Sequence, residues 1–281
     1  MSNAYWSNFR GMTVDAYVEH FVNASAVDRQ RMQETAAALP AEITTLLDVG
    51  CGYGQFLRVV RDMRGIAGTG VEITAEKVEY MRRALDVDAR IASVDALPFS
   101  DCAFDAVCAL EVIEHLPLDE YDKGRAEMGR VAGSWIIVSV PWRERRRNVK
   151  CPACGCAFNH NYHLRSFHDS DFPSLFPGFA LRSLSSMGER RAAPAWIEVL
   201  GAWRRRELPP FAVCPACGFR RTGPAEQTPL DAAPAGGRRK GATQLRKLAR
   251  HLFSRRTPCW YLALFERIGL PEHATGPVVA K

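Results

Sequence analysis

From residue 45 onward, short apolar stretches alternate with segments of helical periodicity, and this alternation constrains the fold more than any other feature of the chain. Strands are predicted at 46–49, 66–71, 90–94, 106–110, 135–140, 179–185 and 260–265, and helices at 55–63, 75–85, 120–131 and 170–176. Strands that alternate with helices form a parallel sheet covered by helices on both faces. The sequence therefore predicts an α/β fold around one mostly parallel sheet.

The segments outside this alternation suggest three parts. Residues 12–39 have the periodicity of two helices and end at Pro40, which predicts a helical cap over residues 1–40. The sheet domain is expected at 41–189 and 258–270. Residues 190–257 are not needed by the sheet and include the Pro-, Gly- and Ala-rich stretch 222–241, which indicates an insertion with a flexible basic loop.

Composition excludes a wholly disordered chain, because 47% of the 281 residues are hydrophobic. The N-terminus lacks the apolar stretch of a secretory signal, and no apolar run approaches the ~20 residues of a membrane span, so we expect a cytoplasmic protein. The formal charge of +6 comes from arginine clusters such as 143–147 and 246–256. Solvated faces explain most of them, while an anionic substrate, nucleic acid or peripheral contact of the basic segment 244–256 with a membrane are alternatives.

A glycine-rich turn directly follows the first predicted strand. Gly50, Gly52 and Gly54 alternate there, with Asp48 before them and a helix after them. Glycines let the backbone turn sharply and approach a ligand closely. Roughly 20 residues further on, Glu72 closes the second strand, where a carboxylate can accept hydrogen bonds from both hydroxyls of a ribose. The turn alone also suits an oxidoreductase, although nucleotide-binding folds of that class use the spacing G-x-G-x-x-G.

Two further motifs follow the third and fourth strands. They are Asp95-Ala96-Leu97-Pro98-Phe99 and Glu111-Val112-Ile113-Glu114-His115. With these four motifs in order, the sequence resembles the class I S-adenosylmethionine (SAM)-dependent methyltransferases, in particular the group that includes ubiquinone-biosynthesis enzymes. The resemblance covers residues 40–188 and returns near 258–267. It implies a Rossmann-like sheet of seven strands and a SAM cofactor.

The resemblance also assigns cofactor contacts to individual residues. Gly50, Gly52 and Gly54 would line the methionine moiety, Asp48 would hold its amino group and Glu72 would bind the ribose. Asp95 would bond the adenine amino group, with Ala96 contributing its backbone. The remaining contacts that it implies are Cys51, Ile73, Leu110 and Glu111.

His115 is a candidate general base, because it follows the fourth strand at the edge where open α/β sheets bind ligands; a packing or capping histidine is the alternative. Glu111, Glu114 and His115 also have the ligand types for a Mg²⁺-type ion. The motif Glu111-x-x-Glu114-His115 is similar to one in small-RNA 2′-O-methyltransferases and metal-assisted ubiquinone-pathway enzymes. In those families another histidine follows the fifth strand, and His163 occupies a comparable place here.

Five of the nine cysteines fall in two tight groups. Cys151-Pro152-Ala153-Cys154-Gly155 recurs letter for letter from Cys214 to Gly218. Each turn can present two thiolates to one ion, so Cys151, Cys154, Cys214 and Cys217 are predicted to form a closed, structural zinc site. The separation of about 60 residues is longer than in ordinary zinc ribbons. Cys156, His160 and His163 are rival ligands, and a redox dithiol is the alternative.

These observations predict a SAM-dependent methyltransferase that acts, at an oxygen, on a small-molecule, glycan or lipid-linked acceptor. A metal-assisted RNA methyltransferase and a non-catalytic module that kept the fold are the alternatives. The residues identify neither the acceptor nor the oligomeric state.

Overall fold

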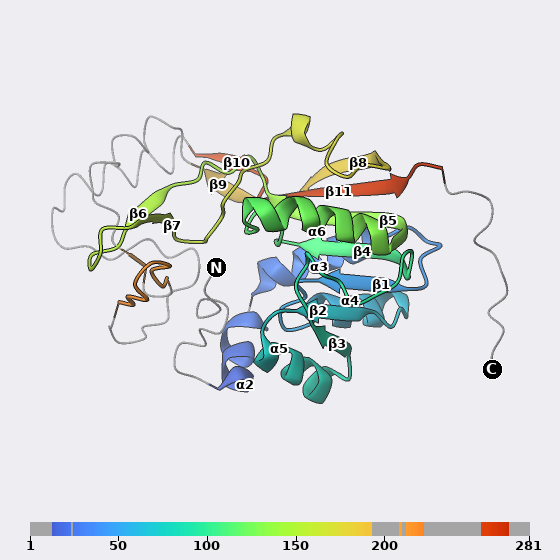
Figure 1. Ribbon diagram of the computed structural model, residues 1–281, viewed down its shortest axis with the longest axis horizontal. Coiled ribbons are helices and arrows are strands. Elements are labelled where there is room, and N and C mark those ends of the chain that lie inside the picture. The colour runs from blue at the N-terminus through green and yellow to red at the C-terminus, as the bar shows by residue number, and fades with distance from the viewer. Residues whose placement is uncertain (1–12, 24, 193–207, 210–211, 222–253, 270–281) are drawn as a thin grey trace.

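The computed structural model describes residues 13–23, 25–192, 208–209, 212–221 and 254–269, and its centre is a seven-stranded sheet (Figure 1). The strand order is β3-β2-β1-β4-β5-β11-β8. These strands are β1 (Leu46–Val49), β2 (Thr69–Glu72), β3 (Asp88–Ile91), β4 (Phe104–Leu110), β5 (Ala132–Pro141), β8 (Phe179–Met187) and β11 (Trp260–Arg267). The first five pair in parallel, whereas β11 runs antiparallel to both β5 and β8.

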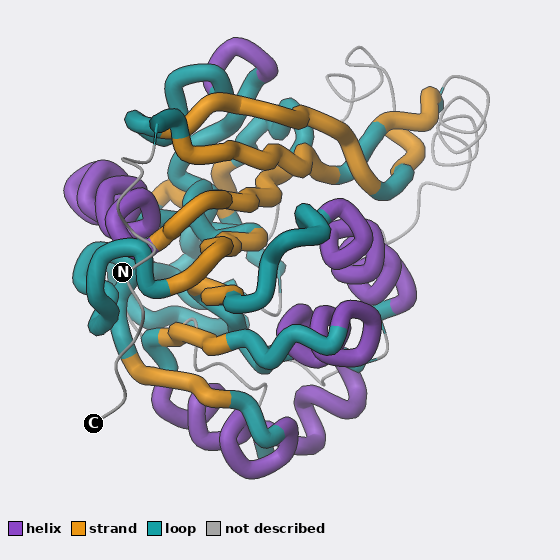
Figure 2. The backbone as a smooth tube through the Cα atoms, turned by 90° about the vertical axis from the view of Figure 1, so that its right-hand side faces the viewer, coloured by secondary structure: helices purple, strands orange, loops and turns teal. Residues whose placement is uncertain are grey.

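Helices lie on both sides of the stacked strands (Figure 2). They are α2 (Val14–Tyr17) with the π-helical turn Val18–Val22, α3 (Ala26–Ala38), α4 (Gln55–Arg64), α5 (Ala75–Tyr80) with the π-helical turn Met81–Leu85, and α6 (Leu118–Val131). Within the described residues, none of these helices is both long enough and apolar enough to cross a membrane.

Alternation along the strands creates two hydrophobic cores, because successive side chains point to opposite faces of a sheet. Leu46 belongs to the core shared with α3, α4 and α5, whereas its neighbour Leu47 belongs to the core shared with α6. Both side chains are fully buried. The near-continuous apolar runs that predicted the strands are thus the signature of a sheet covered on both faces.

The predicted seven-stranded fold is confirmed, with local corrections. The third strand is Asp88–Ile91 rather than 90–94, and the second begins at Thr69 rather than Ile66. The helix predicted at 170–176 is wrong, since only a 3₁₀ turn over Asp169–Asp171 forms there. The Phe172 backbone is still helical, but the turn ends there, and Phe172 and Phe176 are buried against the sheet.

Two short antiparallel pairs extend beyond the main sheet. Strand β9 (Arg190–Ala192) pairs with β10 (Arg255–Thr257), and β6 (Asn148–Lys150) pairs with β7 (Ala157–Asn159). The first pair lies at the base of the predicted insertion, and Arg255 and Arg256, at the end of the basic segment 244–256, belong to strand β10. Residues 244–253 of that segment and the loop 222–241 lie outside the described residues.

Candidate active site

The glycine turn at the end of β1 leaves open space beside the backbone. Gly50 and Gly52 have φ angles of +70° and +57°, a region that favours glycine. A Cβ atom on Gly50 would lie 2.6 Å from a methyl of Val112, whereas one on Gly52 would meet no atom of the described residues within 4 Å. Gly50 is therefore required by the packing of the β4 loop, and Gly52 borders a space that a ligand can occupy.

Glu72 lies beside this turn, as predicted. Its carboxylate is 7% exposed and accepts hydrogen bonds from the backbone amides of Gly52 (3.2 Å), Ile73 (3.0 Å) and Thr74 (3.1 Å). Lys77 places its ammonium 3.6 Å from the same group. Ile73 is 44% exposed next to it. The tip of β2 thus offers a fixed carboxylate and an adjoining apolar side chain.

Asp95 follows the neighbouring strand, since β3 pairs in parallel with β2 as far as Glu72 and Ile91. A turn closed by the amide of Ala96 to the carbonyl of Ser93 (3.1 Å) carries Asp95, which is partly exposed. The ends of three adjacent parallel strands therefore carry Asp48, Glu72 and Asp95, in the order that the sequence predicts.

Arg31 of α3 is a site residue that the sequence analysis missed. Its side chain is 11% exposed, lies 4.0 Å from the carboxylate of Glu111 and donates to Ser139 Oγ at 3.4 Å. The guanidinium lies 5.0 Å from the ring of Trp260, and its Nε has no hydrogen-bond partner among the described residues. An arginine in an N-terminal helix has no local signal of this role, because only the packing of α3 brings it to the site.

The acids around Arg31 are held in an unfavourable environment. Burial raises the pKa of Asp48 to about 8; Arg31 opposes this shift and Glu72 adds to it. Burial likewise raises the pKa of Glu111, against the attraction of Arg31 and a hydrogen bond from Ser139 Oγ (3.1 Å). Glu111 also has a positive φ of 61°, which is unusual for a residue other than glycine. Strain and buried charge together are typical of a functional site.

Two predicted cofactor contacts show different surroundings. The Cys51 side chain is buried and lies 3.5 Å from the sulfur of Met81, so its thiol packs in the core and only its backbone borders the turn. Leu110 is half-buried at the end of β4 and packs against the core that contains α3, α4 and α5.

Glu114, His115 and His163 form a cluster at the same edge of the sheet. Their ligand atoms all lie within 4.8 Å of one another, and the two imidazole rings are 4.7 Å apart. Glu114 is 0% exposed, and neither of its carboxylate oxygens has a hydrogen-bond partner among the described residues. Burial and Glu111 raise its pKa well above the ordinary value. A buried carboxylate without such donors implies that something else binds there.

Hydrogen bonds fix how the two histidines present their rings. His163 Nδ1 lies 2.5 Å from the Glu144 carboxylate, and His115 Nδ1 lies 3.4 Å from the carbonyl of Tyr162. Both partners are acceptors, so both Nδ1 atoms carry a proton. Burial, followed by the nearby His163, lowers the pKa of His115 to about 3, so this ring is neutral at ordinary pH. The pair can accept protons or bind a cation.

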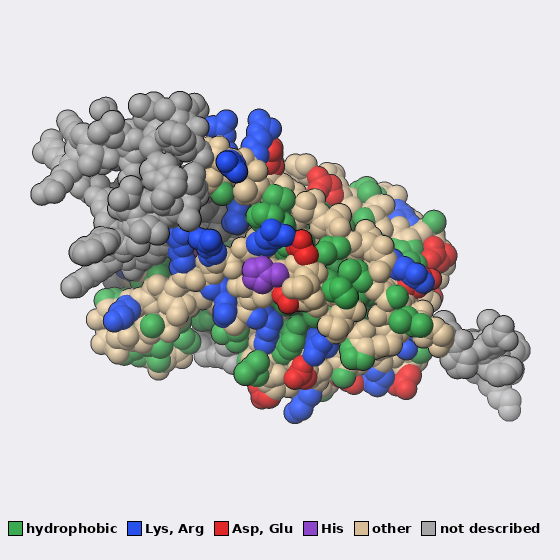
Figure 3. All heavy atoms as spheres, turned by 90° about the horizontal axis from the view of Figure 1, so that it is seen from above, with side chains coloured by type: hydrophobic (Ala, Val, Ile, Leu, Met, Phe, Trp, Pro, Cys, Tyr) green, Lys and Arg blue, Asp and Glu red, His purple; other side chains and the backbone are tan. Residues whose placement is uncertain are grey.

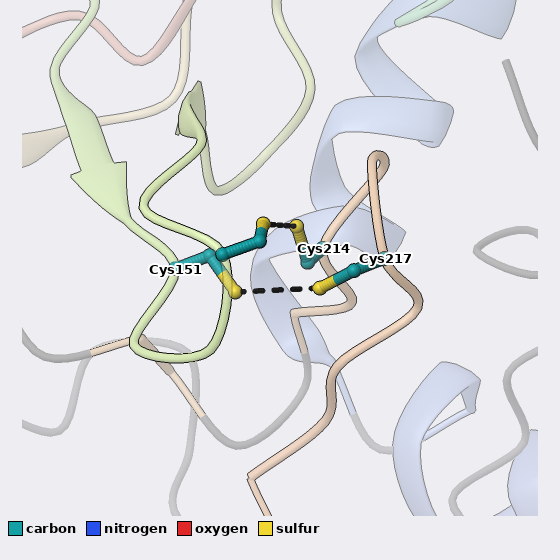
Figure 4. Close-up of side chains that lie close together, drawn as sticks. Cys151, Cys214 and Cys217 are labelled. Atoms are coloured by element: carbon teal, nitrogen blue, oxygen red, sulfur yellow. Dashed lines mark hydrogen bonds between the residues drawn. The ribbon is translucent and has the colours of Figure 1, made fainter.

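The four predicted cysteines converge although they are far apart in the chain. Cys151 Sγ lies 3.7 Å from Cys217 Sγ, and Cys154 Sγ lies 3.5 Å from Cys214 Sγ (Figure 4). All four sulfur atoms lie within 4.8 Å of one another, and neither Cys156 nor His160 belongs to that group. Burial by itself would raise the pKa of Cys214, but hydrogen bonds from the backbone of Cys217 and Ala216 outweigh it and lower this pKa to about 6. Four thiols at these distances suit a tetrahedral ion.

The strand order, the antiparallel β11 and the glycine turn after β1 together define a class I methyltransferase fold. Comparison with known families agrees, because residues 46–133, just under a third of the chain, match the family described as a methyltransferase domain. The chain therefore carries a class I SAM-dependent methyltransferase domain.

Curated relatives match over the same part of the chain. A 2-methyl-6-phytyl-1,4-hydroquinone methyltransferase from Synechocystis is 34% identical over 36% of this chain and 33% of its own length. A ubiquinone biosynthesis O-methyltransferase from Brucella anthropi is 28% identical over 37% of this chain and 44% of its own length. The chain thus spans less than half the length of these relatives.

One solved structure resembles almost the whole chain in fold. It belongs to a complex between the Trm112 methyltransferase activator of Haloferax volcanii and a methyltransferase. The match covers 95% of this chain and 97% of that one, with a TM-score of 0.51 and 17% identity. At this identity the similarity concerns the fold alone.

Proposed function

We propose that this protein transfers the methyl group of SAM to an oxygen atom of a small-molecule, glycan or lipid-linked acceptor. The observation that carries the proposal is that one edge of the sheet combines two sets of residues. The ends of β1, β2 and β3 carry the residues for the cofactor, and Glu114, His115 and His163 follow β4 and β5 beside them. Methyl transfer requires chiefly that acceptor, methyl and sulfur are aligned, which this juxtaposition supports.

The methionine end of SAM carries an ammonium and a carboxylate, and the chain offers one partner for each. Asp48 is the partner for the ammonium, and Arg31 is the partner for the carboxylate. Arg31 suits this role because its Nε lacks a partner within the described part of the chain and its guanidinium is buried among acids that a bound ammonium would help to balance. Glu72 then takes the ribose, with Ile73 and Asp95 beside the adenine.

An acceptor hydroxyl must lose its proton, and the two histidines are the groups that can take it. His115, held by the Tyr162 carbonyl, keeps a lone pair on Nε2, but its pKa of about 3 makes it a weak base unless a bound cation lowers the pKa of the hydroxyl. Glu114, His115 and His163 also fit a divalent cation, which when bound would act as a Lewis acid on the hydroxyl. Two imidazoles and one carboxylate favour a transition metal over Mg²⁺. His163 replaces Glu111 in the ligand set expected from sequence. Glu111 instead accepts a hydrogen bond from Ser139 and forms an ion pair with Arg31.

Phenolic acceptors are the first class to test. One of the matching enzymes is named for a hydroquinone, which bears two phenolic hydroxyl groups, and the other for ubiquinone, a quinone whose reduced form bears two such groups. A phenol has a pKa near 10, which is lower than that of an alcohol, so it gives up its proton to a weak base more readily than an alcohol does.

The cysteine cluster fits a structural zinc ion, held by Cys151, Cys154, Cys214 and Cys217. Four sulfur ligands leave no open coordination position, so the ion would not take part in the chemistry. Its contribution would be to join the turn after β6 to the turn at 214–217.

An RNA acceptor is less favoured, because arginines of the cluster 143–147 already have partners within the protein. Many of the basic side chains lie on the half of one face next to the residues that are not described (Figure 3). Among the described residues, Arg143 pairs with Asp169 at 2.6 Å, and Arg146 donates to the carbonyl of Leu164. These side chains are engaged by the protein itself.

Calorimetry with S-adenosylhomocysteine tests the cofactor site directly. We expect binding that Asp48→Ala or Arg31→Ala weakens by about 10- to 100-fold, since each removes a charged hydrogen bond of about 1.5–3 kcal/mol. His163→Ala should leave the affinity unchanged while abolishing methylation of catechols and hydroquinones, followed by mass spectrometry. Wild-type protein that does not bind the cofactor product would refute the proposal, and methylation of RNA instead of phenols would replace the acceptor class.

A further inference from the structure

We propose that Tyr162 is a positioning residue through which the cysteine cluster sets the orientation of His115 and His163. The proposal rests on the proposed function, because it assigns the cysteine module, defined as residues 148–162, 208–209 and 212–221, a role in that same site. The side chain of Tyr162 belongs to the core of this module, and its backbone contacts the histidines.

The side chain of Tyr162 is part of the core of the cysteine module. It is 5% exposed, and its ring lies 5.6 Å from that of Phe158. The cluster around it contains Cys151, Leu208, Ala212 and Cys214, which come from both cysteine segments. Burial raises the pKa of its phenol to about 12, opposed by a hydrogen bond from the backbone of Val213. Tyr162 is therefore fixed by residues of the segment that carries the second cysteine pair.

The backbone of Tyr162 adopts a conformation that its surroundings must impose. Its φ is +61°, which is uncommon for a bulky residue other than glycine. The Tyr162 amide donates to the carbonyl of Asn159 at 2.9 Å. The Asn159 side chain accepts from the amides of Asn161 (2.8 Å) and His163 (3.4 Å). The turn is thus defined from β7 onward up to His163.

The other side of the turn contacts the catalytic edge. The Tyr162 carbonyl accepts from His115 Nδ1, which fixes the tautomer that leaves the lone pair on Nε2. Two residues later, the amide of Leu164 donates to the carbonyl of Glu114 at 2.7 Å. His163 lies between these contacts with its ring against that of His115. A displacement of the Tyr162 turn would therefore move His163 and release His115 together.

Among the described residues, the module consists of two short segments around one small core. Strands β6 and β7 have three residues each, and an isolated two-stranded hairpin is marginally stable. The second segment, at 212–221, is linked to the first across 66 residues by the pair Cys151 and Cys217. One ion bound to all four thiolates would cross-link the two segments around the Tyr162 ring. We expect the orientation of the histidines to depend on that ion.

Hydrogen exchange on the full chain, with zinc bound and after its removal by chelation, tests the first half of the proposal. In zinc-free protein, or in Cys217→Ser, the amides of Tyr162 and Leu164 should exchange at least tenfold faster. The amides of residues 48–74 should not change, and affinity for S-adenosylhomocysteine should stay within twofold. Cys102→Ser, at an exposed cysteine elsewhere, is the matched control. Equal protection at 162–164 with and without zinc, or wild-type protein that binds no zinc, would overturn the proposal.

The second half of the proposal, that Tyr162 sets the orientation of His115, needs a readout that loss of stability alone would not change. We expect the ring ¹⁵N shifts of His115 to show a single tautomer, with its proton on Nδ1, in wild type and in Tyr162→Phe. In Tyr162→Ala, the shifts should report a mixture of tautomers while the protein still binds equimolar zinc. Tyr162→Ala with the wild-type shifts would refute the positioning role. Failure of the proposed function would be seen separately, as absence of cofactor binding in wild-type protein.

Discussion

Two carboxylates near opposite ends of β4, those of Asp105 and Glu114, have opposite surroundings. At the amino edge, where β4 begins, Asp105 accepts hydrogen bonds from the Thr44 amide (2.8 Å), the Thr44 hydroxyl (2.7 Å) and the Thr45 amide (2.8 Å). Burial opposes ionisation there, but these donors outweigh it and lower the pKa of Asp105. At the carboxyl edge, where β4 ends, Glu114 has no donor among the residues that the structure describes, and its pKa is raised.

The difference shows which acids belong to the fold and which to the site. Asp105 ties the start of β1 to the start of β4 and stabilises the protein as a charged group. Asp48, Glu111 and Glu114 are buried with raised pKa values, so they cost stability when they ionise. A protein tolerates such a cost where a ligand supplies the missing partners. The comparison can be tested one residue at a time.

The largest effect is expected for Gly52→Ala. Its Cβ would enter the open space next to Glu72, so we expect affinity for S-adenosylhomocysteine to fall at least 100-fold, a loss of about 2.7 kcal/mol in binding. Calorimetry measures this loss. The backbone φ of +57° also makes alanine unfavourable by roughly 1 kcal/mol of folding stability.

Gly65→Ala is the control for this change. Gly65 has a φ of +69°, and a Cβ atom added there would likewise meet no atom within 4 Å, but this glycine caps the far end of α4. Both variants should lose similar stability in thermal unfolding, and only Gly52→Ala should lose cofactor binding. Equal binding by the two variants would mean that the space beside Gly52 is not the cofactor site.

The second effect concerns the pH dependence of cofactor binding through Asp48. Its pKa is about 8 in the unliganded protein, and the cofactor ammonium requires the ionised carboxylate. Binding must therefore release a proton, and SAM affinity should rise by up to about tenfold per pH unit between pH 6 and 8. Asp48→Asn should bind weakly with a flat profile. A wild-type profile that is equally flat would show that Asp48 does not contact the ammonium.

The sequence predicts the carboxyl edge well where the signals are local. Gly50, Gly52, Glu72 and Asp95 each lie at the end of a strand or within four residues after it, so locating the strand locates the residue approximately. The cysteine cluster was also predicted, because ligand type and the repeated pentapeptide specify it without any knowledge of the path between the two turns.

Features that depend on distant packing were not predicted. Arg31 reaches the site only because α3 packs on α4, and its neighbours Glu111 and Ser139 lie far along the chain. Tyr162 looks like a packing residue in sequence, since its role comes from its backbone conformation. The helix expected at 170–176 was wrong, because only one 3₁₀ turn forms there although Phe172 and Phe176 are buried at helical spacing.

A third prediction concerns the amino edge. Asp105→Ala removes three hydrogen bonds at partly exposed positions, where water replaces part of the loss, so we expect a destabilisation of about 2 kcal/mol at pH 7. The lowered pKa means that this contribution is present above the unfolded pKa of about 3.8 and is lost as pH falls through the folded value. Urea unfolding of both proteins at pH 7 and pH 3 measures it. A difference that persists undiminished at pH 3 would contradict the electrostatic explanation.

Glu114→Gln should have the smallest effect on stability, and it should stabilise the protein, whereas Asp105→Ala destabilises it. The raised pKa of Glu114 stabilises the folded protein below its ordinary value of 4.5, and this contribution is lost as pH rises toward the folded value. At pH 7 we expect the variant to be about 1 kcal/mol more stable, because the amide avoids the buried charge but still lacks partners. The gain should vanish near pH 4. Addition of Mn²⁺ should reverse the order at pH 7, because a cation that binds Glu114, His115 and His163 stabilises only the wild type. A variant less stable than wild type in metal-free buffer at pH 7 would show that Glu114 has a structural partner, and the contrast with Asp105 would then disappear.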